Sequence, residues 1–195
     1  MSEYGRRGVV GMGLAGGTAL ALGACAPAQA GRSRPSATPT SDGRFAGFTE
    51  YVPVTLEIRT DLGRLDRRMP GVTISSAHWV MQYWQEKREV LPAPDRPIWV
   101  HGVMTLDPAS TRALAEASSG KADPLPGIYP DLRQYVPEGK VFTTVPKEKA
   151  DGILDIEHAM QDDPSRSEPS YFDTEQVAIC ADANLLIFIA REWHT

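Results

Sequence analysis

The sequence predicts an α+β fold, with a mostly antiparallel sheet of five to six strands and two helices packed on one face. Two observations carry this prediction. Segments with helical periodicity cluster early in the chain, and paired apolar strands come late. A helix-poor second half built from hairpin-like strands favours antiparallel pairing, with the helices gathered on one side of the sheet.

The early segments are predicted to be a strand and a helix. Residues 51–59 alternate between apolar and polar side chains, which predicts a half-buried strand. Residues 75–86 begin with two serines that can cap a helix, and their apolar side chains recur at helical spacing, which predicts a helix. The members of that apolar face are Ala77, Val80, Met81 and Trp84.

A strand and a second helix are predicted next. Residues 98–106 are apolar on both faces and predict a central strand. Asp107 can cap a helix whose first position is Pro108, so a short alanine-rich helix is expected up to about Ser118. The proline-rich stretch 121–139 predicts a loop, with one helical turn at residues 131–135.

The last third is predicted to be mainly strands. Residues 141–145 are predicted to form a short strand. Apolar and polar side chains alternate over residues 152–160, which predicts a longer strand. Residues 161–175 are polar and acidic, which predicts a loop. Residues 176–181 and 185–191 are apolar runs joined by an Asp-Ala-Asn turn, which predicts a buried hairpin.

The first 24 residues have the organisation of a secretory signal. Arg6 and Arg7 supply the positive charge, and an uncharged apolar run follows that is too short to cross a bilayer as a helix. The run ends in Leu22, Gly23, Ala24 and Cys25.

This ending resembles the lipobox of bacterial lipoproteins, which implies cleavage before Cys25 and a diacylglycerol on its thiol. The arginine pair with its glycine-rich apolar run resembles a twin-arginine signal, with the general secretory route as the open alternative. A small-x-small site that ends at Ala30 offers a different cut, which would release a soluble protein.

We therefore expect three parts: a signal peptide over 1–24, a lipidated cysteine and flexible tether over 25–47, and a single α+β domain over 48–195. The tether is rich in proline, serine and threonine and lacks any periodicity. We expect the protein at the outer face of the cell membrane, held there through the lipid on Cys25. The net charge of −5 argues against nucleic acid as a partner.

No sequence motif assigns a catalytic residue, a cofactor or a metal. The sequence contains no Gly-x-Ser-x-Gly elbow, no glycine-rich phosphate loop in the domain and no paired Cys-x-x-Cys. His101 and His158 lie on predicted strands and could share a proton or a metal, although hydrogen-bonded core or edge histidines are the simpler interpretation. Asp155 and Glu157 belong to an acidic stretch that a solvated surface explains better than a calcium site.

Aromatic residues suggest a groove for sugar or peptide, with core packing as the simpler alternative. They are tryptophans 79, 84, 99 and 193 and tyrosines 51, 83, 129, 135 and 171.

The chain as a whole resembles short uncharacterised lipoproteins of high-GC Gram-positive bacteria. The likeness rests on the leader, the turn at 69–71, the segment around Trp79, the strand up to Leu106 and the loop from 125 to 137. It implies no functional residue beyond the lipobox.

Three functions remain open from the sequence. The first is a tethered binding or accessory module that meets an envelope protein or glycan. The second is a secreted inhibitor or immunity-type protein, whose acidic surface would suit a basic enzyme. The third is a small hydrolase that uses His101 or His158 with a carboxylate.

Overall fold

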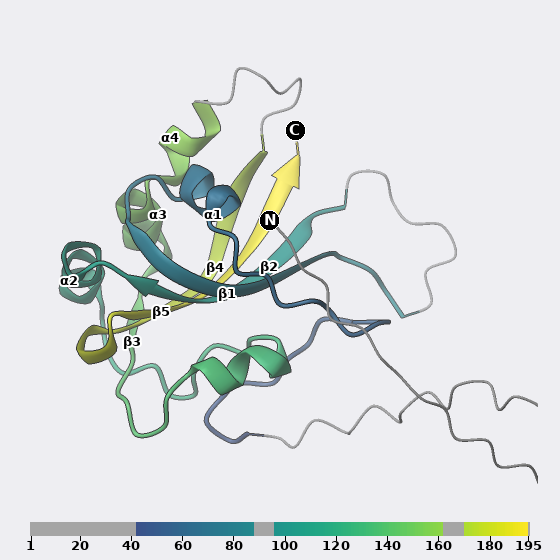
Figure 1. The fold of residues 1–195 in the computed structure, drawn as a ribbon, viewed down its shortest axis with the longest axis horizontal. Coiled ribbons are helices and arrows are strands. Elements are labelled where there is room, and N and C mark those ends of the chain that lie inside the picture. Colours follow the sequence, from purple (N-terminus) through teal and green to yellow (C-terminus); the bar gives the residue numbers. More distant parts are fainter. Residues whose placement is uncertain (1–41, 88–95, 162–169, 195) are drawn as a thin grey trace, which may run out of the picture. The chain divides into compact units, whose positions relative to one another are not determined.

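The computed structural model describes residues 42–87, 96–161 and 170–194. Its centre is a five-stranded antiparallel sheet in the order β1-β2-β5-β4-β3 (Figure 1). The strands are β1 (Ile74–Tyr83), β2 (Ile98–Leu106), β3 (Thr143–Val145), β4 (Ser170–Cys180) and β5 (Leu185–His194). The expected α+β fold with an antiparallel sheet and helices packed against it is confirmed.

The predicted hairpin is present and its second strand is the central strand of the sheet, but its first strand begins at Ser170, inside the stretch predicted as a loop. β4 and β5 pair from Ser170↔His194 to Cys180↔Leu185, across a short 3-10 turn, η2 (Ala181–Ala183). Asn184 closes that turn with a φ of 51°, a conformation that asparagine tolerates better than most residues. β5 then pairs with β2 from Leu185 to Glu192, so most of the hairpin's second strand is held on both sides.

One face of the sheet is covered by four helices (Figure 1). They are α1 (Gly63–Arg68), α2 (Pro108–Ala117), α3 (Lys147–Leu154) and α4 (Ile156–Gln161). Leu65, Leu114 and Leu154 from these helices are fully buried against sheet residues such as Trp79 and Phe188. α2 forms as predicted, with the Asp107 carboxylate accepting hydrogen bonds from the backbone of Ala109 and Ser110.

The other face is covered by two irregular segments. The first is the strap, residues 42–58, and the second runs from 122 to 142 and contains the short helix η1 (Pro130–Tyr135), which the sequence predicted as a helical turn. Phe45, Ile128 and Leu132 from these segments bury Trp99 and Ile187 of the sheet. Both faces of the sheet are therefore inside the protein.

The predicted helix over 75–86 is wrong, because the segment forms strand β1. β1 pairs with β2 along its length, and its other edge makes a bridge between Trp79 and Arg59. Trp79 points to the helical layer and Val80 to the opposite layer, and both are fully buried. Burial on both faces removes the alternation that marks a strand, so apolar residues fell at helical spacing by coincidence.

The predicted strand over 152–160 is also wrong, since the segment spans the end of α3 and most of α4. Asp155 between the two helices has a φ of 59° and ends α3 in the left-handed region. Ala150 and Leu154 face the core from α3, and Ile156 and Ala159 face it from α4. Because the break at Asp155 changes the direction in which side chains of α4 face relative to α3, buried residues of the two helices alternate with polar ones in the sequence as they would in a strand.

In place of the expected strand over 51–59 lies an extended stretch, most of which belongs to the strap. The only ladder contact of residues 51–59 is the bridge of Arg59 with Trp79. Val54 is 67% exposed, whereas Leu56 and Ile58 pack on the sheet, so the three do not share a buried face. The folded part also begins earlier than expected, because Arg44 and Phe45 are already packed.

Substitution of two glycines by alanine should change the stability of the protein in opposite directions. A Cβ on Gly71 would lie 2.1 Å from the carbonyl oxygen of Ile153, so Gly71→Ala should lower the free energy of unfolding by about 2 kcal/mol. Gly152 lies within α3 with open space around it, and Gly152→Ala should raise that free energy by about 0.5–1 kcal/mol. Urea unfolding of the full chain, followed by circular dichroism, measures both; equal effects would contradict the packing at Gly71.

Candidate functional site

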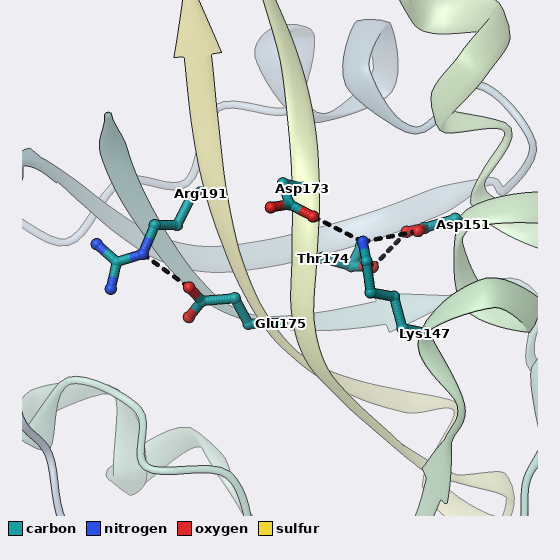
Figure 2. Close-up of polar contacts among 6 residues, drawn as sticks. All are labelled: Lys147, Asp151, Asp173, Thr174, Glu175 and Arg191. Carbon is teal, nitrogen blue, oxygen red and sulfur yellow. Dashed lines mark hydrogen bonds and ion pairs between the residues drawn. The ribbon is translucent and has the colours of Figure 1, made fainter. Parts of the chain in front are cut away.

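A polar cluster lies where α3 begins beside β4, centred on Lys147 (Figure 2). The Lys147 ammonium donates to Asp173 Oδ1 at 2.7 Å and to Asp151 Oδ2 at 2.9 Å, and it lies 3.4 Å from Thr174 Oγ1. The Thr174 hydroxyl donates in turn to the second oxygen of Asp151. All three donors of the ammonium are thus used within the cluster.

The local sequence explains why these side chains meet. Pro146 ends β3 and stands just before α3, whose first residue is Lys147. Asp151 follows one helical turn later, so it reaches the same ammonium as an i,i+4 pair. Asp173 and Thr174 come from β4, and the side chain of Thr174 is almost completely buried.

The electrostatics of the cluster keep Lys147 charged. Partial burial pulls its pKa down, but the hydrogen bonds and negative charges of Asp173 and Asp151 outweigh that cost and raise the pKa above its ordinary value. A lysine that acts as a base or nucleophile needs the opposite shift. The cluster therefore offers a fixed ion pair rather than a reactive amine.

A second pair of interactions lies on the other side of β4 at a bulge (Figure 2). Glu175 is the extra residue between Thr174 and Gln176, and its carboxylate accepts from Arg191 Nε at 2.7 Å. The same guanidinium donates to Glu50 of the strap at 2.8 Å. Arg191 thus links the strap, β4 and β5.

A hollow of about 280 Å³ borders both groups of side chains. Lys147 and Glu175 lie in its lining, together with Gln176 and Thr144. The rest of the lining is largely apolar and contains prolines 124, 126 and 146. The hollow is therefore partly apolar and partly charged, which suits contact with a single side chain of a partner.

The same features protect a sheet edge. β3 pairs with β4 only from Thr143↔Ile179 to Val145↔Val177, so β4 continues well past its neighbour. A very short edge strand, a bulge, a proline and a charged lysine are the means by which proteins prevent such edges from joining other chains. This structural role accounts for the position of Lys147 and Pro146 without any catalysis.

A second hollow of about 460 Å³ lies between α2 and the turn η2. Arg112 and Glu116 line it from α2, and Asn184 lines it from the turn. The hydroxyl of Thr111 is buried there without a hydrogen-bond partner among the described residues. These groups do not converge on a common point that would define a ligand.

His101 is buried on β2, beneath the strap, with only 3% of its surface exposed. Its Nδ1 accepts a hydrogen bond of 3.1 Å from the backbone N–H of Tyr129. Burial, followed by the positive charge of Arg191, lowers its pKa to about 3. Within the described part of the chain no carboxylate hydrogen bonds to His101, so the pairing of a histidine with a carboxylate that a hydrolase would need is not formed at His101 there.

The other weak candidates lie elsewhere. His158 belongs to α4, on the helical side of the sheet, whereas the ring of His101 lies on the opposite side. Asp155 ends α3, and Glu157 is exposed in the first turn of α4. The structure therefore does not bring the two histidines to one face of the sheet. The leader residues Arg6, Arg7, Leu22, Gly23, Ala24 and Cys25 lie outside the described residues.

Sequence reasoning missed a buried ionic cluster on the helical side. Glu192 is fully buried on β5 and accepts from Arg64 at 3.1 and 2.5 Å and from Arg68 at 3.3 Å. Arg68 is also buried and donates to Ser170 at the start of β4. A signal was present, since Glu192 interrupts the alternating apolar row of Leu186, Phe188 and Ala190.

The aromatic residues divide between core and surface. Trp79, Trp99 and Tyr129 are buried, as the simpler alternative held. Tyr51 and Tyr83 are 37% and 49% exposed, and Gln82 donates to the backbone oxygens of both. Arg96 lies over the ring of Tyr83 at 5.2 Å. This is a surface contact rather than a groove.

The described residues contain neither a metal site nor a membrane-spanning helix, and the chain has no match among known proteins. No group of three or more His, Cys, Asp or Glu among the described residues could hold a metal ion. Among the described helices, none is long and apolar enough to cross a membrane. No family model, curated protein or solved structure matches the chain. The likeness to short lipoproteins stays a prediction.

Two glutamates that both bind arginine should differ sharply in their effect on stability. Glu192→Gln leaves two guanidinium groups without their buried carboxylate and should lower the free energy of unfolding by about 3 kcal/mol. Glu175→Gln affects a pair whose carboxylate is 39% exposed and should cost less than about 1 kcal/mol. Chemical denaturation of the two variants measures this difference, and similar losses would contradict it.

Proposed function

We propose that the chain is a surface-tethered binding or accessory module at the cell envelope, and that it meets a basic polypeptide segment. The observation that carries this proposal is the distribution of charge along the chain. From Asp151 to Asp182 the described residues include six carboxylates and no lysine or arginine. We call the five of them on α3, the α3–α4 turn, α4 and β4 the acidic edge: Asp151, Asp155, Glu157, Asp173 and Glu175.

The elements of the acidic edge are neighbours in the fold, since α3 and α4 both pack on β4. Lys147 and Arg191 compensate part of its charge, but Asp155 and Glu157 form no ion pair with another described residue. Asp173 keeps 45% of its side chain exposed while bonded to Lys147. An excess of one sign of charge on adjacent elements attracts partners of the opposite sign and speeds their association.

A polypeptide fits this surface better than a bare cation. Calcium needs six to eight converging oxygens, and the carboxylates nearest each other already hold Lys147. The hollow beside Lys147 and Glu175 adds apolar proline surface next to the charges. Lysine and arginine side chains combine an apolar stem with a charged end, so they match such a mixed surface.

The predicted anchor supports a role at the envelope. Lipid on Cys25 would leave about 18 residues before Arg44 and Phe45, which pack in the domain, and a flexible chain of that length has a typical span of about 20–25 Å. That length would let the domain reach neighbouring proteins while staying at the membrane. The alternative of a secreted inhibitor uses the same acidic edge against a basic enzyme, and it requires cleavage after Ala30 rather than before Cys25.

The acidic edge can be tested with charge-neutralising variants of the full chain. Asp155→Asn together with Asp173→Asn should weaken binding to a labelled lysine-rich peptide about three- to tenfold at about 50 mM salt. Asparagine tolerates the left-handed backbone at 155, so the fold should be kept. Fluorescence anisotropy gives the dissociation constants.

The matched control is Glu116→Gln together with Glu138→Gln, which removes the same charge from exposed positions elsewhere. It should leave affinity for the peptide almost unchanged. Equal losses in both double variants would show that net charge, rather than the acidic edge, attracts the peptide. If the protein does not bind the peptide but binds envelope glycan, and salt does not weaken that binding, the partner is a glycan and the proposal of a basic polypeptide is wrong.

The anchor is tested by mass spectrometry of the full chain, expressed in a bacterium that processes lipoproteins. We expect a mass that corresponds to a chain beginning at Cys25 and carrying a diacylglycerol, and loss of that form in Cys25→Ala. An unmodified chain that begins at Gly31 would instead support cleavage after Ala30 and the secreted alternative.

A further inference from the structure

The strap is attached to the sheet at few points. Among the described residues, the strap's backbone amides donate hydrogen bonds only from Arg44, Phe45, Ala46 and Leu56, and those of Arg44 and Phe45 go to Asp42 within the strap itself. Phe45 is its single buried residue, and the others are half-buried or exposed. Segments with few backbone hydrogen bonds and little buried surface open at a lower free energy than the sheet they cover.

His101 lies at the point where the strap meets the sheet. The ring of Phe48 contacts three rings edge-on, those of His101 at 5.7 Å, Tyr129 at 5.8 Å and Trp99 at 6.0 Å. Tyr129, from the segment 122–142, connects His101 to the strap. Its N–H donates to His101, and its hydroxyl accepts from Leu56 N of the strap at 3.2 Å. A change at His101 therefore reaches the strap through both Phe48 and Tyr129.

From this arrangement we propose that the strap opens separately from the sheet, and that protonation of His101 in mild acid releases it. This opening does not depend on the partner of the acidic edge. The strap belongs to the layer that covers the sheet on the face opposite the helices.

Protonation is incompatible with the closed strap for geometric reasons. The Nδ1 of His101 is an acceptor in the closed form, and a proton there would point at the N–H of Tyr129. The new charge would also lie among the rings of Phe48 and Trp99, away from water. The closed form must therefore lose both contacts for His101 to become charged.

The neighbouring charged and titratable groups do not compensate such a charge. Arg191 on β5 adds a positive charge near His101, and Glu50 of the strap is already bonded to it. His78 on β1 is stacked on Tyr135 at 3.6 Å and carries no carboxylate partner among the described residues. Tyr129 presents its N–H, which is a donor.

The direction of the pH effect follows from the two states. Burial holds the pKa of His101 at about 3 when the strap is closed, against an ordinary value of 6.5 when the side chain reaches water. Between these values the open form binds more protons, so acidification favours opening. Lowering the pH from about 7.5 to about 5 should increase the population of the open strap about 30-fold.

Residue-specific amide hydrogen exchange of the full chain tests the proposal. Protection factors, which correct for the intrinsic pH dependence of exchange, are compared for the amides of Ala46, Leu56 and Tyr129 and for the β2–β5 ladder. At neutral pH the first group should be less protected than the ladder, and its protection should fall about 30-fold by about pH 5. Equal protection of the strap and the ladder would show that the strap opens only with global unfolding and would overturn the proposal.

Two variants identify the group that titrates. His101→Gln supplies a neutral amide oxygen for the N–H of Tyr129, so the fall in strap protection with pH should disappear. Phe48→Ala should lower strap protection at every pH and keep the pH dependence, and it serves if His101→Gln does not fold. A pH dependence that persists in His101→Gln, or that is lost in Phe48→Ala while His101 is present, would overturn the assignment to His101.

Discussion

Burial of the sheet on both faces is the constraint on which the rest of the structure depends. β2 and β5 form its centre, and their side chains enter the helical layer and the irregular layer alternately. Neither layer could be lost without exposing residues such as Phe188 or Ile187, which are completely buried. The helices, the strap and the segment 122–142 are therefore parts of one core rather than additions to a stable sheet.

Two-sided burial also decided which elements could be predicted. The β4–β5 hairpin, β2 and α2 were predicted because apolar runs, a turn and a cap lie next to each other in sequence. β1 was not, since Trp79 and Val80 are apolar neighbours that face opposite layers. The pair α3 and α4 was not, since Asp155 adopts a left-handed backbone that no local pattern announced. Local sequence shows which residues are adjacent in the chain. Whether a segment becomes a strand or a helix here also depended on the layer that packs against it.

The polar groups show the same limit. The sequence singled out His101 but could not show that Tyr129 and Phe48, far apart from it in the chain, would surround it. It gave no sign that Lys147 would meet Asp173, because their contact spans two elements and a bulge. Glu192 was visible as a charge in an apolar row, but its arginine partners come from α1, more than 120 positions earlier. Charges that pair over such distances are found only from the fold.

The position of β5 has a consequence for biosynthesis. β5 joins β2 to β4, so the early pair β1–β2 and the later pair β3–β4 belong to separate pieces until residues 185–194 have been synthesised. A nascent chain in which β5 has not yet been synthesised therefore carries two open strand edges and two uncovered apolar surfaces. The sheet cannot close before then, and in that interval a chaperone would meet an incompletely folded polypeptide.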